Sequence, residues 1–243
     1  MREREQRSGL FVSIGVILLL LSGSVYASIT PMPIVRIEWG EGGIWERNYT
    51  TEEINPLGND RFSITGDWES SFGEASWAVT FDSDPYMIVA ASMTNSSKTD
   101  TLPYTLVVQV PVSSSLAAPT RHGGSVSGSI TTGPSGGTIS TIEPLALYQG
   151  QIDGVGVFDL YEHEWSWSRG GGGTESFPDN EAGLPPSLPS GAVLNTIGIE
   201  FNFSLTPQTG VGLTGYFEVI PEPATLAIIG LGGLAIIWRK NRK

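Results

Sequence analysis

The sequence contains no cysteine and only two histidines among its 243 residues. The absence of cysteine excludes disulfide bonds, thiolate metal ligands and thiol nucleophiles. The histidines are His122, in a glycine-rich turn, and His163, between two glutamates. Neither belongs to a Ser-His-Asp pattern, so nucleophilic catalysis has no visible support. We therefore expect both side chains at the surface or in loops, and we expect no enzyme activity from them.

Basic residues are scarce as well, with 13 Lys and Arg against 25 Asp and Glu. The imbalance is greater between Ser28 and Val219, where 22 acidic residues stand against 6 basic ones. A strongly acidic domain argues against binding to nucleic acid and to anionic lipid surfaces. The composition is typical of a soluble, secreted protein that attracts cations.

A long amphipathic helix is also missing from residues 28–219, where apolar and polar residues instead alternate with a period of two. About ten short strands separated by Gly, Ser and Thr turns predict an all-β fold, either an antiparallel β-sandwich or a jelly roll. The length suffices for one sizeable core or at most two small domains. The clearest predicted strands are residues 34–39, 61–65, 77–81, 86–94, 102–112, 147–152, 155–160, 197–205 and 213–219.

Three pairs of strands are expected to form hairpins. Asp153-Gly154 is a strong two-residue turn signal between residues 147–152 and 155–160. The other two pairs join 86–94 to 102–112 and 125–132 to 138–142, across polar and glycine-rich turns. Residues 162–167 are expected to continue the strand before them, which would put His163 on the face opposite its flanking glutamates. Residues 170–189, with four consecutive glycines and four prolines, are expected to form a flexible loop.

The first 27 residues have the layout of a signal peptide. Arg2, Arg4 and Arg7 form a positively charged start, and residues 10–21 are an apolar run. Small residues precede Ala27, so we expect cleavage after Ala27. The alternative is an uncleaved N-terminal anchor.

The chain ends in a second segment of distinct composition. Pro221-Glu222-Pro223 is followed by an uncharged run over 224–238 and then by a basic end. Fifteen helical residues span roughly 22 Å, against about 30 Å for a bilayer core, so we expect a single short transmembrane helix over 224–238. The basic end predicts a C-terminus on the cytoplasmic side. The alternative is a buried helix of a soluble domain. The expected anchor residues are Leu226, Ile228, Leu231, Ile236, Trp238, Arg239 and Lys240.

This three-part tail resembles the PEP-CTERM sorting signal of Gram-negative bacteria. The resemblance implies recognition by exosortase, a membrane cysteine transpeptidase, and removal of the tail near Pro221, Glu222 and Pro223. It also implies export across the inner membrane and a host that makes an exopolysaccharide or biofilm matrix. The expected organisation is then a signal peptide (1–27), a β-sandwich body (28–219) and a sorting signal (220–243).

Two features of the body have the character of a binding site. Trp165 and Trp167 are two residues apart, so they share a face of a strand and are a candidate platform for a sugar ring. The alternative is that both simply fill the core. Aspartates bracket several turns, namely Asp82, Asp84, Asp153 and Asp179, and a structural calcium site is a further hypothesis. No other cofactor is expected.

Three functions remain open from the sequence. The first is an exported, exosortase-processed structural or interaction protein of the cell surface or of an exopolysaccharide matrix. The second is a carbohydrate-binding module that uses the same export route. The third is a secreted hydrolase with two close carboxylates, an arrangement that the sequence does not reveal.

Overall fold

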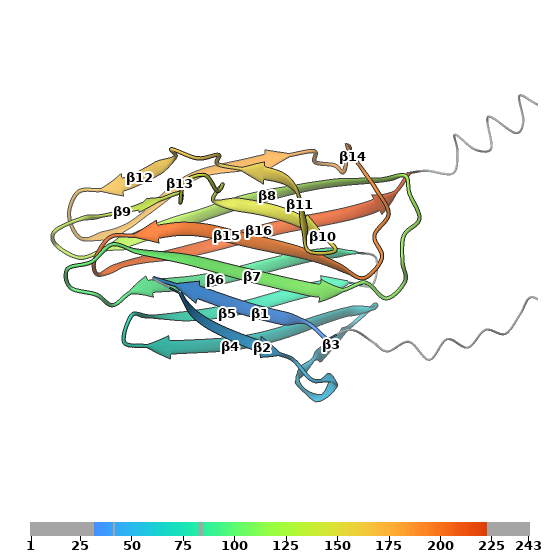
Figure 1. The fold of residues 1–243 in the computed structure, drawn as a ribbon, viewed down its shortest axis with the longest axis horizontal. Helices are drawn as coiled ribbons and strands as arrows, with labels where there is room; N and C mark the ends of the chain where they lie inside the picture. Colours follow the sequence, from blue (N-terminus) through green and yellow to red (C-terminus); the bar gives the residue numbers. More distant parts are fainter. Residues whose placement is uncertain (1–31, 41, 83–84, 223–243) are drawn as a thin grey trace, which may run out of the picture.

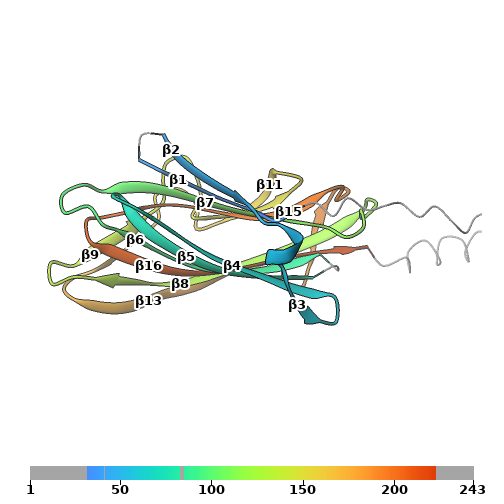
Figure 2. The ribbon, with the colours of Figure 1, turned by 90° about the horizontal axis from the view of Figure 1, so that it is seen from below.

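The computed structural model describes residues 32–40, 42–82 and 85–222. Within them the chain forms two antiparallel sheets that lie face to face, as Figure 2 shows edge-on. The order of the first, sheet A, is β11-β10-β15-β7-β1-β2, and the order of the second, sheet B, is β13-β8-β16-β6-β5-β4-β3. The short strands β9 and β12 extend sheet A, and β14 pairs with β8 in sheet B. The expected all-β antiparallel fold is confirmed, and its form is a sandwich (Figure 1).

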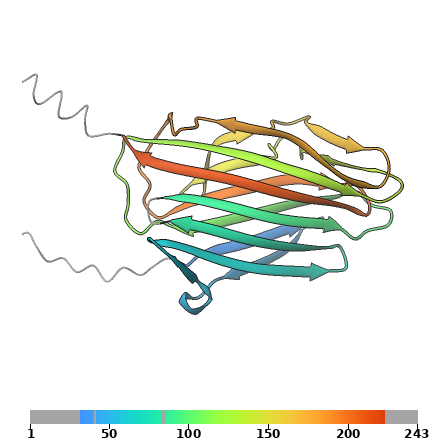
Figure 3. The ribbon, with the colours of Figure 1, turned by 180° about the vertical axis from the view of Figure 1, so that it is seen from behind.

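Sheet A consists of β1 (Ile34–Trp39), β2 (Gly43–Asn48), β7 (Leu102–Pro111), β9 (Gly137–Ser140), β10 (Tyr148–Ile152), β11 (Val155–Leu160), β12 (Ser166–Arg169) and β15 (Thr196–Leu205). Sheet B, which faces the viewer in Figure 3, consists of β3 (Asn55–Gly58), β4 (Arg61–Ser70), β5 (Gly73–Asp82), β6 (Tyr86–Asn95), β8 (Thr120–Thr132), β13 (Gly173–Ala182), β14 (Leu188–Ser190) and β16 (Thr209–Pro221). A single turn of 3-10 helix, η2 (Thr51–Glu53), separates β2 from β3.

The core lies between the sheets and is filled by alternate residues of each strand. In β15, for example, Ile199, Phe201 and Phe203 are buried with at most 1% exposure. Tyrosines in sheet A or directly after one of its strands also tie the two layers together, because their hydroxyls donate hydrogen bonds to backbone carbonyls of sheet B and its turns. The pairs are Tyr49 with Thr65 (3.1 Å), Tyr104 with Phe72 (2.8 Å) and Tyr148 with Tyr216 (2.7 Å).

Several predicted strands are confirmed. The first predicted strand coincides with β1, and the alternating stretch 197–205 lies within β15. The Asp153-Gly154 hairpin also forms between β10 and β11. Asp153 and Gly154 have φ angles of 51° and 76°, which are the positive values that a two-residue type I′ turn requires.

The other two predicted hairpins are wrong. Strands β6 and β7 lie in different sheets, since β6 pairs with β5 and β16 whereas β7 pairs with β1 and β15. Strands β8 and β9 are separated in the same way. The polar connections between these strands therefore cross from one layer to the other. A short polar linker permits both arrangements, and the partners of each strand are set by residues far away in the sequence.

Two further predictions from the sequence are wrong. Residues 162–167 do not continue β11; a turn that includes His163 and Glu164 leads instead to β12, which begins at Ser166. The stretch 170–189 is not a loop throughout, because residues 173–182 form β13 at the edge of sheet B. The pairing of β13 with β8 breaks between Phe177 and Asn180, and this bulge accommodates Pro178.

Both ends of the described chain lie at the same end of the sandwich, as Figures 1 and 3 show. The turns β4–β5, β6–β7 and β15–β16 lie at the opposite end, where they contact one another. The backbone N–H of Ser96 donates to Phe72, and that of Gln208 donates to Ser97, both at 3.2 Å. The molecule therefore has one end that carries the chain termini and another that carries a set of joined turns.

Candidate functional site

The last strand, β16, runs through the middle of sheet B and ends at the residues predicted to be processed. It pairs with β8 over its whole length, so that Ile220 lies opposite Arg121 and Pro221 opposite Thr120. The backbone N–H of Glu222 continues the pattern by donating to the carbonyl of Pro119 at 3.1 Å. The first two residues of the Pro-Glu-Pro segment are thus part of the folded sheet.

The position of Pro221 explains why a proline is tolerated here. Backbone groups of successive residues point alternately to the two neighbouring strands. The N–H of Val219 points away from β8 and donates to the carbonyl of Pro85 at 2.8 Å. The nitrogen of Pro221 points to the same side, beyond the start of β6 at Tyr86. The missing N–H of Pro221 therefore removes no bond to the described strand β6.

Arg121 holds the end of this strand from the neighbouring one. Its Nη2 lies 3.2 Å from Oε1 of Glu222, and its Nη1 donates to the backbone carbonyl of Ser187 at 3.0 Å. The Arg121 side chain is 39% exposed and that of Glu222 is 20% exposed, so solvent weakens the ion pair. The arginine links three segments, because β14 begins just after Ser187 and pairs with β8.

Residues 219–243 match the family model of the PEP-CTERM protein-sorting motif. The chain carries a PEP-CTERM sorting motif. The resemblance read from the tail is thereby confirmed, and the match begins at Val219, within β16. The motif indicates a protein that is exported, processed by exosortase and sorted to the cell envelope or surface. No curated protein matches the chain.

Several residues predicted to act in export and sorting lie outside the described ones. They are the signal peptide with Ala27, Pro223 of the motif and the whole predicted helix 224–238 with its basic end. Among the residues that the structure describes, no helix has the length and apolar character needed to cross a membrane. The signal peptide, its cleavage site and the anchor stay predictions.

The two candidate sugar-binding tryptophans are half-buried. Trp165 precedes β12 and packs against Tyr161, with ring centroids 4.4 Å apart, and against Phe177 at 5.2 Å. Trp167 lies within β12, opposite Ile139 of β9. Both contact the core, and neither is fully enclosed. A sugar platform at Trp165 and Trp167 stays a prediction.

The expectation for the histidines is right for one of them. His163 is exposed in the turn between β11 and β12. His122 is buried with 3% exposure, because it lies on the inward face of β8 and not in a turn. Its ring stacks on Phe158 at 5.3 Å and contacts Phe217 at 6.1 Å. Burial lowers the pKa of the His122 imidazole, since the charged form is poorly solvated there.

The aspartates considered for calcium are placed in different parts of the molecule. The Asp153 carboxylate accepts backbone N–H bonds from Leu194, Asn195 and Thr196 at 2.7 to 2.9 Å, so it joins two loops. Asp84 is not among the described residues. Within the described part of the chain, no three His, Cys, Asp or Glu side chains gather to hold a metal ion. The calcium site stays a prediction.

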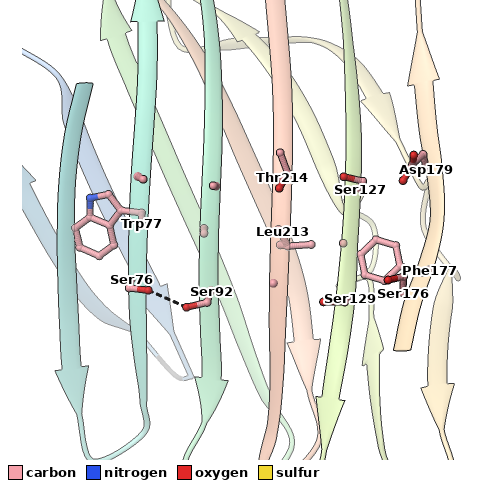
Figure 4. A pocket seen from close by; sticks show the side chains of 15 residues that line it. Ser76, Trp77, Ser92, Ser127, Ser129, Ser176, Phe177, Asp179, Leu213 and Thr214 are labelled. Atoms are coloured by element: carbon pink, nitrogen blue, oxygen red, sulfur yellow. Dashed lines mark hydrogen bonds between the residues drawn. The ribbon is translucent and has the colours of Figure 1, made fainter. Parts of the chain in front are cut away.

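An open groove of about 640 Å³ crosses the outer face of sheet B (Figure 4). Its floor is made of small side chains, and Asp179 is the charged residue of its lining. The Oγ atoms of Ser76 and Ser92 are 2.8 Å apart. Four serines and a glycine lie side by side on neighbouring strands: Ser76, Ser92, Gly212, Ser129 and Ser176. The floor of the groove is therefore rich in hydroxyl groups.

Sequence reasoning identified Pro221 and Glu222 but missed Arg121 and Ser187. Nothing near Arg121 in the sequence marks it as a neighbour of the tail. The sequence offers one indication, which is that basic residues are rare: Arg121 is one of six between Ser28 and Val219. The contact itself depends on the pairing of β8 with β16.

Proposed function

We propose that the chain is an exported, exosortase-processed β-sandwich that acts as a structural or interaction protein, either at the cell surface or in an exopolysaccharide matrix. The observation that carries the proposal is the continuity of β16 with the sorting motif, whose match begins at Val219. Because no linker separates them, the whole sandwich stays close to whatever the processed end is joined to.

The shape of the body supports this role. The ends of the described chain lie at one end of the sandwich, and the joined turns β4–β5, β6–β7 and β15–β16 lie at the other (Figure 1). A body attached through its C-terminus presents these turns away from the attachment point. Phe72, in the β4–β5 turn, is 48% exposed there and is available to a partner.

The surface chemistry also suits a matrix. The acidic balance between Ser28 and Val219 disfavours binding to anionic surfaces. The serine-lined face of sheet B offers hydroxyl groups to hydrated, hydroxyl-rich surroundings. The absence of cysteine means that folding outside the cytoplasm needs no disulfide chemistry.

Fractionation of the native host tests the proposal. The full chain is compared with a chain truncated after Glu222, which keeps the folded sheet and loses the rest of the motif. We expect the full chain in the surface or matrix fraction and the truncated chain elsewhere in the envelope or in the medium. Mature full-length chain retained in the cytoplasm would contradict the proposal.

The partial exposure of Trp165 and Trp167 favours carbohydrate binding as a second candidate function. Binding of the purified body to exopolysaccharide from its host, measured by calorimetry, tests this candidate. Replacing both tryptophans by alanine should abolish binding, whereas Trp45→Ala, a partly buried tryptophan on β2, should not. Unchanged binding in the double variant would remove the tryptophan platform. The hydrolase hypothesis stays a prediction without assigned residues.

A further inference from the structure

The sorting motif and the folded body overlap by several residues. Val219, Ile220 and Pro221 belong to β16, and Glu222 still bonds through its backbone to Pro119. A processing enzyme that binds an extended segment needs free access to the backbone groups of that segment. While β16 is paired with β8, one edge of residues 219–222 is occupied. The folded state therefore competes with the enzyme for the start of the motif.

We propose that Arg121 is a positioning residue that controls access to the sorting motif. The end of β16 has to separate from β8 before exosortase binds Pro221 and Glu222, and the Arg121–Glu222 ion pair opposes this separation. The inference rests on the proposed function, since it takes exosortase processing near Pro221 to Pro223 as given. It goes beyond that function by assigning a role in processing to a residue outside the motif.

The end of β16 is held by few backbone bonds, so it can separate from β8 locally. On the side away from β8, the last backbone bond between described residues runs from Val219 to Pro85, and Pro221 has no N–H to donate on that side. Among the described residues, 220–222 are held through their backbone by β8 and by Pro119 just before it. Within the described part of the chain, the interactions that have to break are the pairing of Ile220 and Pro221 with β8, the Glu222 N–H bond and the ion pair. The rest of the sheet remains closed when they do.

Substitution of Arg121 changes how easily the end of β16 separates from β8. Glu222 belongs to the motif, so its own substitution would change recognition by the enzyme as well as the contact. Arg121 lies on β8, outside residues 219–243, so its replacement leaves the sequence of the motif unchanged. The additional bond from Arg121 to the Ser187 carbonyl keeps the guanidinium in position beside Glu222. Arg121→Lys keeps the charge, and Arg121→Ala removes it.

The test measures the rate at which the full chain loses its tail in the native host. Pulse labelling gives the time course, and intact mass identifies the processed chain. Exposed ion pairs of this kind alter an equilibrium by about two- to fivefold. We expect Arg121→Ala to lose its tail about two to five times faster than the wild type and Arg121→Lys to behave nearly as the wild type. Arg47→Ala is the matched control, because it breaks another surface ion pair, with Glu53 at 2.6 Å. This control should leave the rate unchanged.

Hydrogen exchange distinguishes local opening from general loss of stability. In the purified full chain, Arg121→Ala should speed exchange of the Ile220 and Glu222 amides and leave those of β15 unchanged. Faster exchange throughout both sheets would mean that Arg121 is merely structural, which overturns the inference. Equal rates of tail removal in Arg121→Ala and the wild type also overturn it. An uncleaved tail in every variant, the wild type included, instead overturns the proposed function.

A covalent lock provides a second test. Ile220 and Arg121 are direct cross-strand partners, whose Cα atoms are about 5 Å apart in such pairs, a separation that a disulfide spans. The chain has no other cysteine. A variant with both Ile220→Cys and Arg121→Cys should keep its tail when oxidised and lose it after reduction. Processing of the oxidised form at the wild-type rate would contradict the need for strand separation.

Discussion

The side-chain amide of Asn95 donates a hydrogen bond to the backbone carbonyl of Leu205, 2.8 Å away, across the gap between the two sheets. Asn95 ends β6 in sheet B, and Leu205 ends β15 in sheet A. The same amide donates to the carbonyl of Asp100, and its oxygen accepts the N–H of Ser97. The Asn95 side chain is completely buried. It thus fixes the turns at the end of the sandwich that faces away from the chain termini.

Asn95→Ala is therefore expected to destabilise the body by about 2–3 kcal/mol, because it leaves buried backbone groups without partners. Urea unfolding measures this loss. Asn48→Ala, at an exposed position of β2, is the control and should change the unfolding free energy by less than about 0.5 kcal/mol. Equal stability of the two variants would show that Asn95 does not hold the turns together.

The buried His122 predicts that the body loses stability in mild acid. Its pKa is lowered from the ordinary 6.5, so the unfolded chain binds a proton more readily than the folded one. The neutral His122 ring makes its full contribution to the free energy of unfolding above pH 6.5. This contribution is lost as the pH falls from there toward the lower pKa of the folded state. His122→Leu should remove this part of the pH dependence.

The check is the unfolding free energy of wild type, His122→Leu and His163→Leu between pH 7.5 and pH 5. His163 is exposed and serves as the control substitution. A wild-type curve that runs parallel to that of His122→Leu over this range would show that the buried imidazole is not linked to folding.

Asp153 is expected to stabilise the junction of the β10–β11 turn with the segment before β15. Burial opposes ionisation of the Asp153 carboxyl, but the N–H groups of Leu194, Thr196 and Asn195 outweigh it and lower its pKa. This stability is present above the ordinary value of 3.8 and is lost as the pH falls through the folded-state pKa. Asp153→Ala should cost about 1–2 kcal/mol at neutral pH.

Asp153→Asn is the control for this effect. Asparagine also tolerates the positive φ of 51° at this position and keeps one acceptor oxygen, so it should cost less than alanine. Thermal unfolding of both variants measures the difference. A larger loss for asparagine than for alanine would contradict the assigned role of the carboxylate.

The parts of this structure that were predicted from the sequence are those fixed by local chemistry. Asp153-Gly154 specifies a two-residue turn whatever surrounds it, and the strict alternation of 197–205 specifies a strand with one buried face. The Pro-Glu-Pro tail is recognisable for the same reason, because its three parts are contiguous. Each of these features is complete within a short stretch of sequence.

The parts that were missed depend on which strands become neighbours. The connection between β6 and β7 has the composition of a hairpin turn, yet Asn95 anchors it to β15 in the opposite sheet. The glycines that follow His122 predict a turn, whereas Gly123 and Gly124 are in β8. An added Cβ at Gly124 would lie 2.7 Å from the Tyr148 hydroxyl. Arg121 was missed because its partner, Glu222, comes from the far end of the chain.

The central claim is that the tail is removed at the motif that begins in β16. Its most direct test is the intact mass of the mature protein from its native host, compared with the mass of the Pro223→Ala variant. The account predicts a wild-type chain that ends between Pro221 and Pro223 and a variant that retains its full C-terminus. An intact C-terminus in both proteins would contradict exosortase processing and leave the tail as an ordinary anchor.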